Sequence, residues 1–394
     1  DYNNLLRYKT RLNQDNLSSL QIQYLYMRSY FDNIITYKRG YNYYYQQIMK
    51  YWGRQSNYFK AMIGLTLCKT NQQRFANEHI YPSLIENATL TKDRGMYWKS
   101  NVYGYYWYQA PIEQQAIMIE FADEVSKNSQ YKQARRVAEM QTWLILQKQT
   151  NNWRTTKATA DACYALLLRG KDLLTTSTQV VVQLGNKTVS SQTEETKAGS
   201  GYFKKRFEAK DIQNDMGNIS VTTTGNSDQK NSSVSYGAVY WQYFENLDRI
   251  TSAATPLSLT KNIFIEKNTA EGKKLLPLEA NEELSVGDKV IIRIVLKSDR
   301  NMEYMHLRDM RAACMEPQNV LSGYKWQDGL SYYESTKDAA TDFFISNINR
   351  GTYVFAYPVY ITHSGSFSAG IATIQCYYAP QFSSHSEGFI IQVK

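Results

Sequence analysis

Residues 303–379 are the most informative part of the chain and read EYMHLRDMRAACMEPQNVLSGYKWQDGLSYYESTKDAATDFFISNINRGTYVFAYPVYITHSGSFSAGIATIQCYYA. Apolar and polar residues alternate in several runs, and turn residues separate these runs. Such alternation is typical of strands with one buried face. The same pattern occurs before the stretch, at 290–296, and after it, at 389–393. We therefore expect residues 253–394 to form an antiparallel β-sandwich.

Residues 1–170 have a different pattern, which predicts helices. Apolar residues recur at helical spacing in 18–31, 41–52, 57–68, the segment after Pro111, 131–147 and 155–168. Pro111 suits a first helical turn, and Gly170 suits a helix end. Short amphipathic helices bury their apolar faces best when they pair, so we expect part of an α/α toroid.

Residues 171–252 return to a strand pattern. Val180–Leu184 is an apolar run, and Gly185-Asn186 after it predicts a tight turn. Residues 191–200 and 222–233 are rich in turn residues and predict loops, whereas Tyr236–Phe244 predicts an aromatic strand. The predicted fold class is thus multidomain α and β. It consists of a partial toroid at 1–170, a β-sheet segment at 171–252 and a sandwich at 253–394.

Short motifs in a fixed order lie along the predicted sandwich. They are His306-Leu307-Arg308-Asp309, Glu316-Pro317, Ser322-Gly323-Tyr324, Tyr332-Tyr333-Glu334, Asp342-Phe343-Phe344, Arg350-Gly351-Thr352-Tyr353-Val354-Phe355 and His363-Ser364-Gly365-Ser366-Phe367. This order resembles the C-terminal macroglobulin-like domain of the bacterial α-2-macroglobulins, a family of protease-trapping proteins.

The resemblance extends into the helical region. Gly95-Met96-Tyr97-Trp98, Pro111-Ile112-Glu113-Gln114-Gln115-Ala116 and Trp153-Arg154-Thr155-Thr156-Lys157-Ala158-Thr159-Ala160 are similar to landmarks of the family's thioester-type domain. The resemblance implies that this domain is incomplete here and that 171–252 is half of a CUB-like domain. It also implies a protease inhibitor of the periplasm or cell envelope, with proteases and upstream domains of the same chain as partners. A membrane contact would come only through an upstream lipid anchor.

The family's thioester joins a Cys and a Gln spaced as Cys-x-x-Gln, and this chain lacks that motif. Cys68 and Gln72, like Cys314 and Gln318, are one residue too far apart. We therefore expect the motif to lie upstream or to be absent, and we assign no catalytic residue, cofactor or metal ligand.

Several charged residues admit a catalytic and a structural interpretation. Glu303, His306, Arg308 and Asp309 lie close together, and His306 could act as a base. Since no nucleophile accompanies them, we interpret them as an ion-pair network at a strand end. Glu113, Asp123 and Glu124 fall on one predicted helix, so they do not form an opposed acid–base pair, and helix capping explains Glu113. His363 suits a turn, and His79 and His385 have no neighbours that suggest a metal.

The charge distribution and the cysteine spacing argue against a nucleic-acid-binding protein and a zinc-binding protein. The net charge is +9, but Lys and Arg are scattered, and the cluster Lys204-Lys205-Arg206 suits a solvated strand edge, so no nucleic-acid partner is expected. The four cysteines have no zinc-site spacing. Cys68 and Cys163 are predicted to be small buried hydrophobes, and whether Cys314 and Cys376 pair is left open.

The 33 tyrosines and 7 tryptophans suit inter-domain contacts but also carbohydrate stacking. A polysaccharide-active enzyme, with Trp107 and the segment Tyr103–Tyr108 as a cleft wall, is therefore an alternative. An envelope scaffold without a thioester is another. For the inhibitor, the expected contact residues are Tyr240, Trp241, Tyr243, Phe244, Trp326, Tyr332 and Tyr333.

Overall fold

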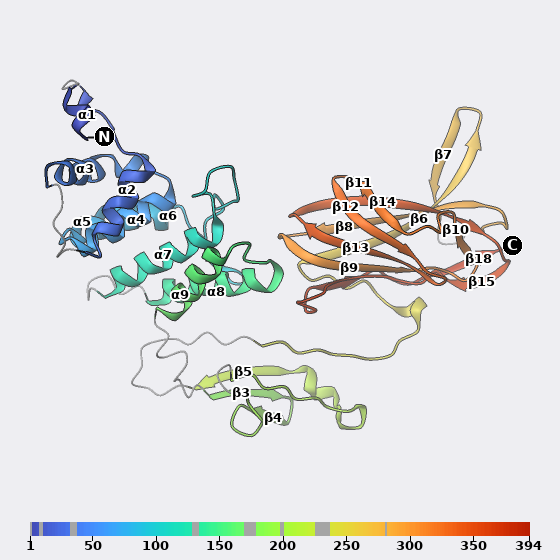
Figure 1. Ribbon diagram of the computed structural model, residues 1–394. Helices are drawn as coiled ribbons and strands as arrows, with labels where there is room; N and C mark the ends of the chain where they lie inside the picture. Colours follow the sequence, from blue (N-terminus) through green and yellow to red (C-terminus); the bar gives the residue numbers. More distant parts are fainter. Residues whose placement is uncertain are drawn as a thin grey trace. The chain divides into compact units, whose positions relative to one another are not determined.

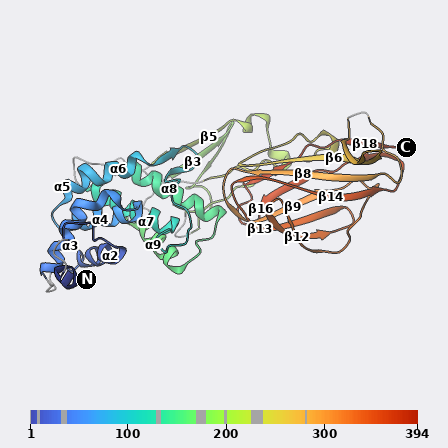
Figure 2. The same ribbon diagram turned by 90° about the horizontal axis from the view of Figure 1, so that it is seen from above.

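The computed structural model describes residues 2–7, 11–31, 38–127, 134–168, 179–197, 201–224, 237–279 and 282–394. The chain divides into two compact units. Unit 1 consists of Asp1–Leu146 and Trp153–Ser235, and unit 2 consists of Gln147–Asn152 and Tyr236–Lys394. The fold is mixed α and β, with a helical region followed by antiparallel sheets (Figures 1 and 2).

The helices of unit 1 are α1 (Tyr2–Arg7), α2 (Ser19–Arg28), α3 (Lys38–Tyr51), α4 (Asn57–Lys69), α5 (Gln73–Phe75), α6 (Tyr81–Glu86), α7 (Pro111–Ser126), α8 (Ala134–Thr150) and α9 (Thr156–Leu167). Most of them match the predicted segments, with boundaries that differ by a few residues, whereas α1, α5 and α6 were not predicted. Helix α7 contacts both α4 and α9, as the two views show.

Helix α7 is more deeply buried than its one-sided apolar pattern predicts. Its polar residues Gln114 and Gln115 are buried along with its apolar ones. The nitrogen of the Gln115 amide is paired, because Nε2 donates to the backbone oxygens of Met96 at 2.8 Å and Met140 at 3.2 Å, whereas Oε1 has no hydrogen-bond partner in the described structure. A buried amide costs little free energy when it is hydrogen-bonded, so α7 can be the central helix.

Short strands in unit 1 form two small sheets. The first is a hairpin of β1 (Thr89–Thr91) and β2 (Gly95–Tyr97), which was not predicted. The second has the order β4-β3-β5, with β3 at Gln179–Leu184, β4 at Lys187–Ser190 and β5 at Ile219–Thr224. Gly185 in the β3–β4 turn has a φ of 55°, a conformation that favours glycine, and this confirms the predicted turn.

Two predictions for this region are wrong. Residues 222–224 belong to β5 and not to a loop, while residues 225–233 lie outside the described residues. The segment 237–246 forms no strand, and Tyr236 is not described. Aromatic residues favour strands only where a neighbouring strand is present to pair with, and the Tyr243 and Phe244 side chains are exposed to solvent instead.

Unit 2 contains a β-sandwich of two main sheets. The five-stranded sheet has the order β10-β14-β8-β6-β7, and the six-stranded sheet has the order β11-β12-β13-β9-β16-β17. In the first sheet β6 is Leu257–Thr269, β7 Gly272–Pro277, β8 Lys289–Ser298, β10 Met315–Pro317 and β14 Gly351–Ile361. In the second, β9 is Met302–Met310, β11 Gly323–Gln327, β12 Leu330–Thr336, β13 Ala340–Ile348, β16 Ala372–Cys376 and β17 Ser383–His385. A separate pair consists of β15 (Gly365–Ser368) and β18 (Ile390–Val393).

The predicted alternation in the sandwich is confirmed. Val290, Ile292, Ile294 and Leu296 of β8 are buried, and they contribute to the core that fills the space between the sheets. Burial of such side chains contributes about 1.5–3 kcal/mol each. The β6–β7 hairpin extends beyond the body of the sandwich (Figure 1).

Candidate functional site

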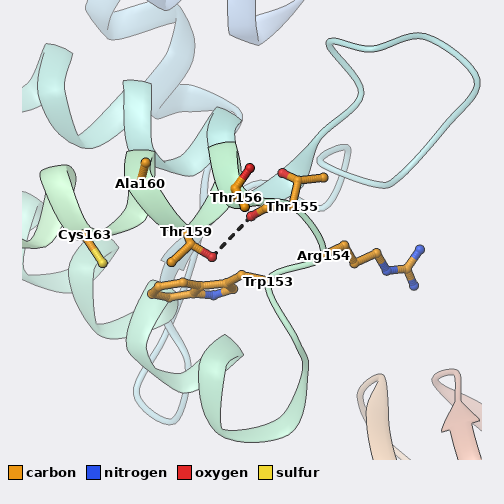
Figure 3. A pocket seen from close by; sticks show the side chains of 7 residues that line it. All are labelled: Trp153, Arg154, Thr155, Thr156, Thr159, Ala160 and Cys163. Carbon is orange, nitrogen blue, oxygen red and sulfur yellow. Dashed lines mark hydrogen bonds between the residues drawn. The ribbon is translucent and has the colours of Figure 1, made fainter.

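An open pocket of about 430 Å³ lies at the start of α9. Figure 3 shows the Trp153 ring beside Thr159, while the Arg154 side chain points away from Thr159 and Cys163. The residues that line the pocket are Trp153, Arg154, Thr155, Thr156, Thr159, Ala160 and Cys163. Most of them belong to a stretch on which the resemblance to a thioester-type domain rests.

Thr155 holds this end of α9 in place. Its Oγ1 accepts a hydrogen bond from the backbone N–H of Ala158 at 2.9 Å, which caps the helix. The same hydroxyl donates to Oε1 of Glu113 at 3.2 Å. Glu113 lies in the first turn of α7 and is buried. Glu113 makes no capping hydrogen bond in α7, although capping was predicted for it. Its carboxylate instead accepts from Thr155, which joins the starts of α7 and α9.

An aromatic loop lies beside the pocket. The Arg154 guanidinium is 4.3 Å from the ring centroid of Tyr103. Trp107 packs edge-on against Tyr58 and Phe59 of α4, with centroids 5.9 Å apart in both pairs. Tyr105 is almost fully exposed. The loop thus presents rings to solvent but is anchored to α4 through Trp107.

The prediction that Glu303, His306, Arg308 and Asp309 form one ion-pair network at a strand end is wrong. These residues lie along β9 and not at its end, and alternate residues of a strand point to opposite faces. Arg308 is exposed on the outer face of the sheet, whereas Asp309 is buried between the sheets. His306, also on the outer face, has Nε2 at 2.9 Å from Oδ1 of Asp342 on β13.

Asp309 belongs to a buried polar cluster that crosses the sandwich. Its Oδ1 lies 2.7 Å from Nζ of Lys261 on β6, and neither side chain is exposed. Nζ of Lys261 also donates to the backbone oxygens of Met310 at 2.6 Å and Ala369 at 3.1 Å. The Tyr357 hydroxyl on β14 donates to Oδ2 of Asp309 at 2.6 Å. Burial, together with the nearby Asp309 carboxylate, raises the pKa of Tyr357 well above its ordinary value.

This cluster was missed in the sequence, although one signal pointed to it. Lys261 occupies an inward position in the alternating strand that contains Leu257, Leu259, Ile263 and Ile265. A charged residue at such a position requires a buried counter-charge, which here is Asp309.

Exposed rings gather on the outer surface of the six-stranded sheet, in what we call the outer aromatic face. Phe344 of β13 stacks on the His306 ring with centroids 4.8 Å apart, and Tyr324 of β11 packs edge-on against Tyr333 of β12 at 5.1 Å. A cavity of about 150 Å³ opens between the stacked pair His306 and Phe344 and the rings of Tyr304, Tyr377 and Tyr378. The outer aromatic face consists of Tyr304, His306, Tyr324, Trp326, Tyr333, Phe344, Tyr377 and Tyr378.

Tyr332 is not part of this face, which corrects its predicted role as a contact residue. It points into the core, where it packs against Phe343 and Phe355. Residues 332 and 333 alternate along β12, so only Tyr333 can face outward.

All four cysteines are free thiols. Cys314 and Cys376 are buried and unpaired, and Cys68 is half-buried. Cys163 is exposed, so the prediction that it is buried is wrong. It lies on the pocket side of α9, which periodicity alone did not distinguish from the packed side.

Among the described residues, no three His, Cys, Asp or Glu side chains are grouped closely enough to hold a metal ion. His363 lies between β14 and β15, as predicted for a turn residue. No helix in the described part of the chain is both long and apolar enough to cross a membrane.

Residues 257–381 match the sequence family described as the bacterial alpha-2-macroglobulin MG10 domain. This range contains β6 to β16 and includes both the Lys261–Asp309 pair and the outer aromatic face. Residues 257–381 are a bacterial alpha-2-macroglobulin MG10 domain. The resemblance noted in the predicted sandwich is thereby confirmed.

Solved structures similar to the chain are bacterial alpha-2-macroglobulins as well. Trypsin-activated alpha-2-macroglobulin from Escherichia coli has 12% identity and a TM-score of 0.41, covering 94% of this chain and 23% of that one. The E. coli protein activated by porcine elastase has 12% identity and a TM-score of 0.34, covering 95% and 33%. Salmonella alpha-2-macroglobulin reacted with methylamine has 12% identity and a TM-score of 0.31, covering 95% and 22%. No curated protein sequence matches the chain.

The chain spans less than two thirds of the length of each of these three structures. Because the superpositions are loose, the assignment of the MG10 domain rests on the sequence match. The functional candidates are therefore the surfaces of the MG10 domain and the pocket in unit 1.

Proposed function

We propose that this chain is part of a bacterial alpha-2-macroglobulin-like inhibitor that traps proteases, and that it is not an enzyme. The observation that carries this proposal is the MG10 match over residues 257–381. Similar solved structures describe an E. coli alpha-2-macroglobulin activated by trypsin and one activated by elastase. By that analogy, proteases are the partners of the full-length protein. The family resemblance of the sequence implies a place in the periplasm or cell envelope.

Within such a protein, this chain contributes structure and inter-domain surfaces. We assign residues 1–170 to an α/α toroid of thioester type, 171–252 to a CUB-like β segment and 253–394 to the macroglobulin-like sandwich. The small sheet in unit 1 supports the CUB-like assignment, because Ile219 and Val221 on the face of β5 are 47% and 60% exposed. An apolar face of this kind is expected to be covered by further strands.

Trapping is a mechanical mechanism, and the described residues are consistent with that role. Cleavage elsewhere in the protein would allow the domains to move as rigid bodies and to enclose the protease. The enclosed protease would keep a working active site. The sandwich suits this role because its two sheets are joined through a buried core and an ion pair.

Incubation of the full-length protein with trypsin tests the proposal. A trap predicts that trypsin still cleaves a small chromogenic peptide, while its cleavage of a large protein substrate falls sharply. A covalent adduct that methylamine pretreatment prevents would show a thioester, and protection without an adduct would show noncovalent trapping. Equal cleavage of both substrates would overturn the trap and favour an envelope scaffold.

A further inference from the structure

We propose that the outer aromatic face of the MG10 domain binds a neutral carbohydrate chain. This inference is independent of protease trapping. It rests on the composition of the six-stranded sheet's outward positions, on the order in which cross-strand pairing arranges the rings, and on the cavity that opens between them.

Cross-strand pairing places four rings in one continuous row. Tyr324 pairs with Tyr333, Tyr333 with Phe344 and Phe344 with His306, from β11 through β12 and β13 to β9. Neighbouring strands are about 4.8 Å apart, so the row spans several ring widths across the sheet. Gln375 of β16 continues the row beyond His306 with an amide side chain.

A second group of rings lies next to this row. Trp326 follows Tyr324 by two residues on β11, and 70% of its side chain is exposed. Tyr304 packs edge-on against Tyr378 at 5.3 Å, and both line the cavity of about 150 Å³ with Tyr377. The cavity also borders His306 and Phe344 and therefore lies between the two groups.

The composition of the face selects the class of ligand. The outward positions between the rings are Ser331, Ser346 and Gln375, and neither they nor the rings carry a formal charge while His306 is neutral. None of these outward side chains is aliphatic, so the face offers ring faces together with hydroxyl, phenol and amide tips. Ring faces carry a negative quadrupole that attracts polarised C–H groups, and phenol, hydroxyl and amide tips exchange hydrogen bonds with hydroxyl groups.

A pyranose presents that combination, with C–H groups on its faces and hydroxyl groups at its edge. An uncharged face is also complementary to an uncharged ligand, since a charged one would lose hydration without gaining a counter-charge. The charged side chains next to the face are held at its border: Asp342 is buried and bonded to His306, Arg308 lies opposite Asp342 two residues further along the strands, and Lys325 is paired with the buried Glu334.

The rings are held in place before any ligand binds. The hydrogen bond between His306 Nε2 and Asp342 fixes the imidazole, which stacks on Phe344 with an angle of 9° between the planes. Tyr333 is half-buried against Tyr324. Less conformational entropy is therefore lost when a ligand binds.

The test is calorimetric titration of the full 394-residue chain with three neutral hexasaccharides, namely cellohexaose, maltohexaose and chitohexaose. We expect at least one to bind with micromolar to millimolar affinity and to change tryptophan fluorescence. Loss of one stacking ring in Tyr324→Ala, Trp326→Ala or Phe344→Ala should weaken binding by about 3- to 10-fold.

Tyr360→Ala is the matched control, because Tyr360 is an exposed tyrosine on β14 of the opposite sheet. It should leave the affinity unchanged, and thermal melting should show each variant folded. The proposal is overturned if none of the three hexasaccharides binds at millimolar concentration. It is also overturned if Tyr360→Ala weakens binding as much as Trp326→Ala, or if light scattering shows a dimer that Trp326→Ala dissociates, because a second copy would then cover the face.

Discussion

Nζ of Lys261 lies 2.7 Å from Oδ1 of Asp309 in the interior of the MG10 sandwich, and both side chains are fully buried. The two residues come from different sheets, so the ion pair spans the core. Two backbone oxygens accept hydrogen bonds from the Lys261 ammonium group, and the Tyr357 hydroxyl donates to Oδ2 of Asp309. A buried pair of this kind depends on every partner, because loss of one leaves a charge without compensation.

Lys261→Met is therefore expected to destabilise the sandwich by about 3–5 kcal/mol. Hydrogen exchange followed by mass spectrometry, read on peptides from β6 and β9, measures this change separately from unit 1. The double variant Lys261→Met with Asp309→Leu should recover part of the loss, since no buried charge remains. If the single and double variants are equally unstable, the uncompensated charge is not the cause.

Tyr357 gives the sandwich a defined response to alkaline pH. Its pKa in the folded protein is raised by burial and by Asp309, so the unfolded chain releases this proton first. The stabilisation is complete below the ordinary tyrosine pKa of about 10 and is lost as the pH rises above it. Tyr357→Phe should be less stable at neutral pH by about 1–3 kcal/mol, because Asp309 loses a donor. Its stability should fall less steeply than that of the wild type above pH 10, and calorimetric melting across this range measures both effects.

Thr155 connects two helices, so its removal should cost more than loss of a simple cap. Thr155→Ala is expected to lower the free energy of unfolding of the helical region by about 1–2 kcal/mol. A double-mutant cycle with Glu113→Ala, measured by thermal melting in far-ultraviolet circular dichroism, isolates the contact between the two side chains. Thr156→Ala is the control, since its hydroxyl is one residue past the cap, and a coupling of zero would remove the link between α7 and α9.

The four thiols should react with Ellman's reagent in a fixed order. Cys163 is exposed and should react at once, whereas burial raises the pKa of Cys68 to about 12 and should slow its reaction. Cys314 and Cys376 should react only after unfolding, because both are buried and burial raises the pKa of each. Two thiols in denaturant, rising to four after reductant is added, with Cys163 and Cys68 still reactive in the folded protein, would show instead that Cys314 and Cys376 form a disulfide.

The sequence was most informative where the spacing of apolar residues alone determines whether a segment is a strand or a helix. The alternation around Val290–Leu296 predicted β8, and the apolar spacing in 57–68 predicted α4 almost to the residue. Periodicity failed where the outcome depends on a neighbour. The aromatic run at 237–244 has strand propensity but no pairing partner in the described structure, and Cys163 lies on the open side of a helix.

The candidate surfaces were harder to predict than the fold. Glu303, His306, Arg308 and Asp309 are close in sequence, yet the strand sends Asp309 inward and its neighbours outward. The partners of Asp309 lie about 50 residues away in either direction, at 261 and 357, and no local pattern connects them. The row of rings on the outer face likewise exists only once the strand register is known.

The position of Lys261 also limits how the sandwich can fold. If β6 slid by two residues along the facing sheet, its ammonium group would meet apolar side chains instead of Asp309, and the backbone oxygens of Met310 and Ala369 would lose their donor. Aliphatic and aromatic contacts tolerate such a slip far better, since they carry no direction. One charged side chain in an otherwise apolar strand thus excludes misaligned sheets during folding, and so determines which sandwich forms as well as how stable it is.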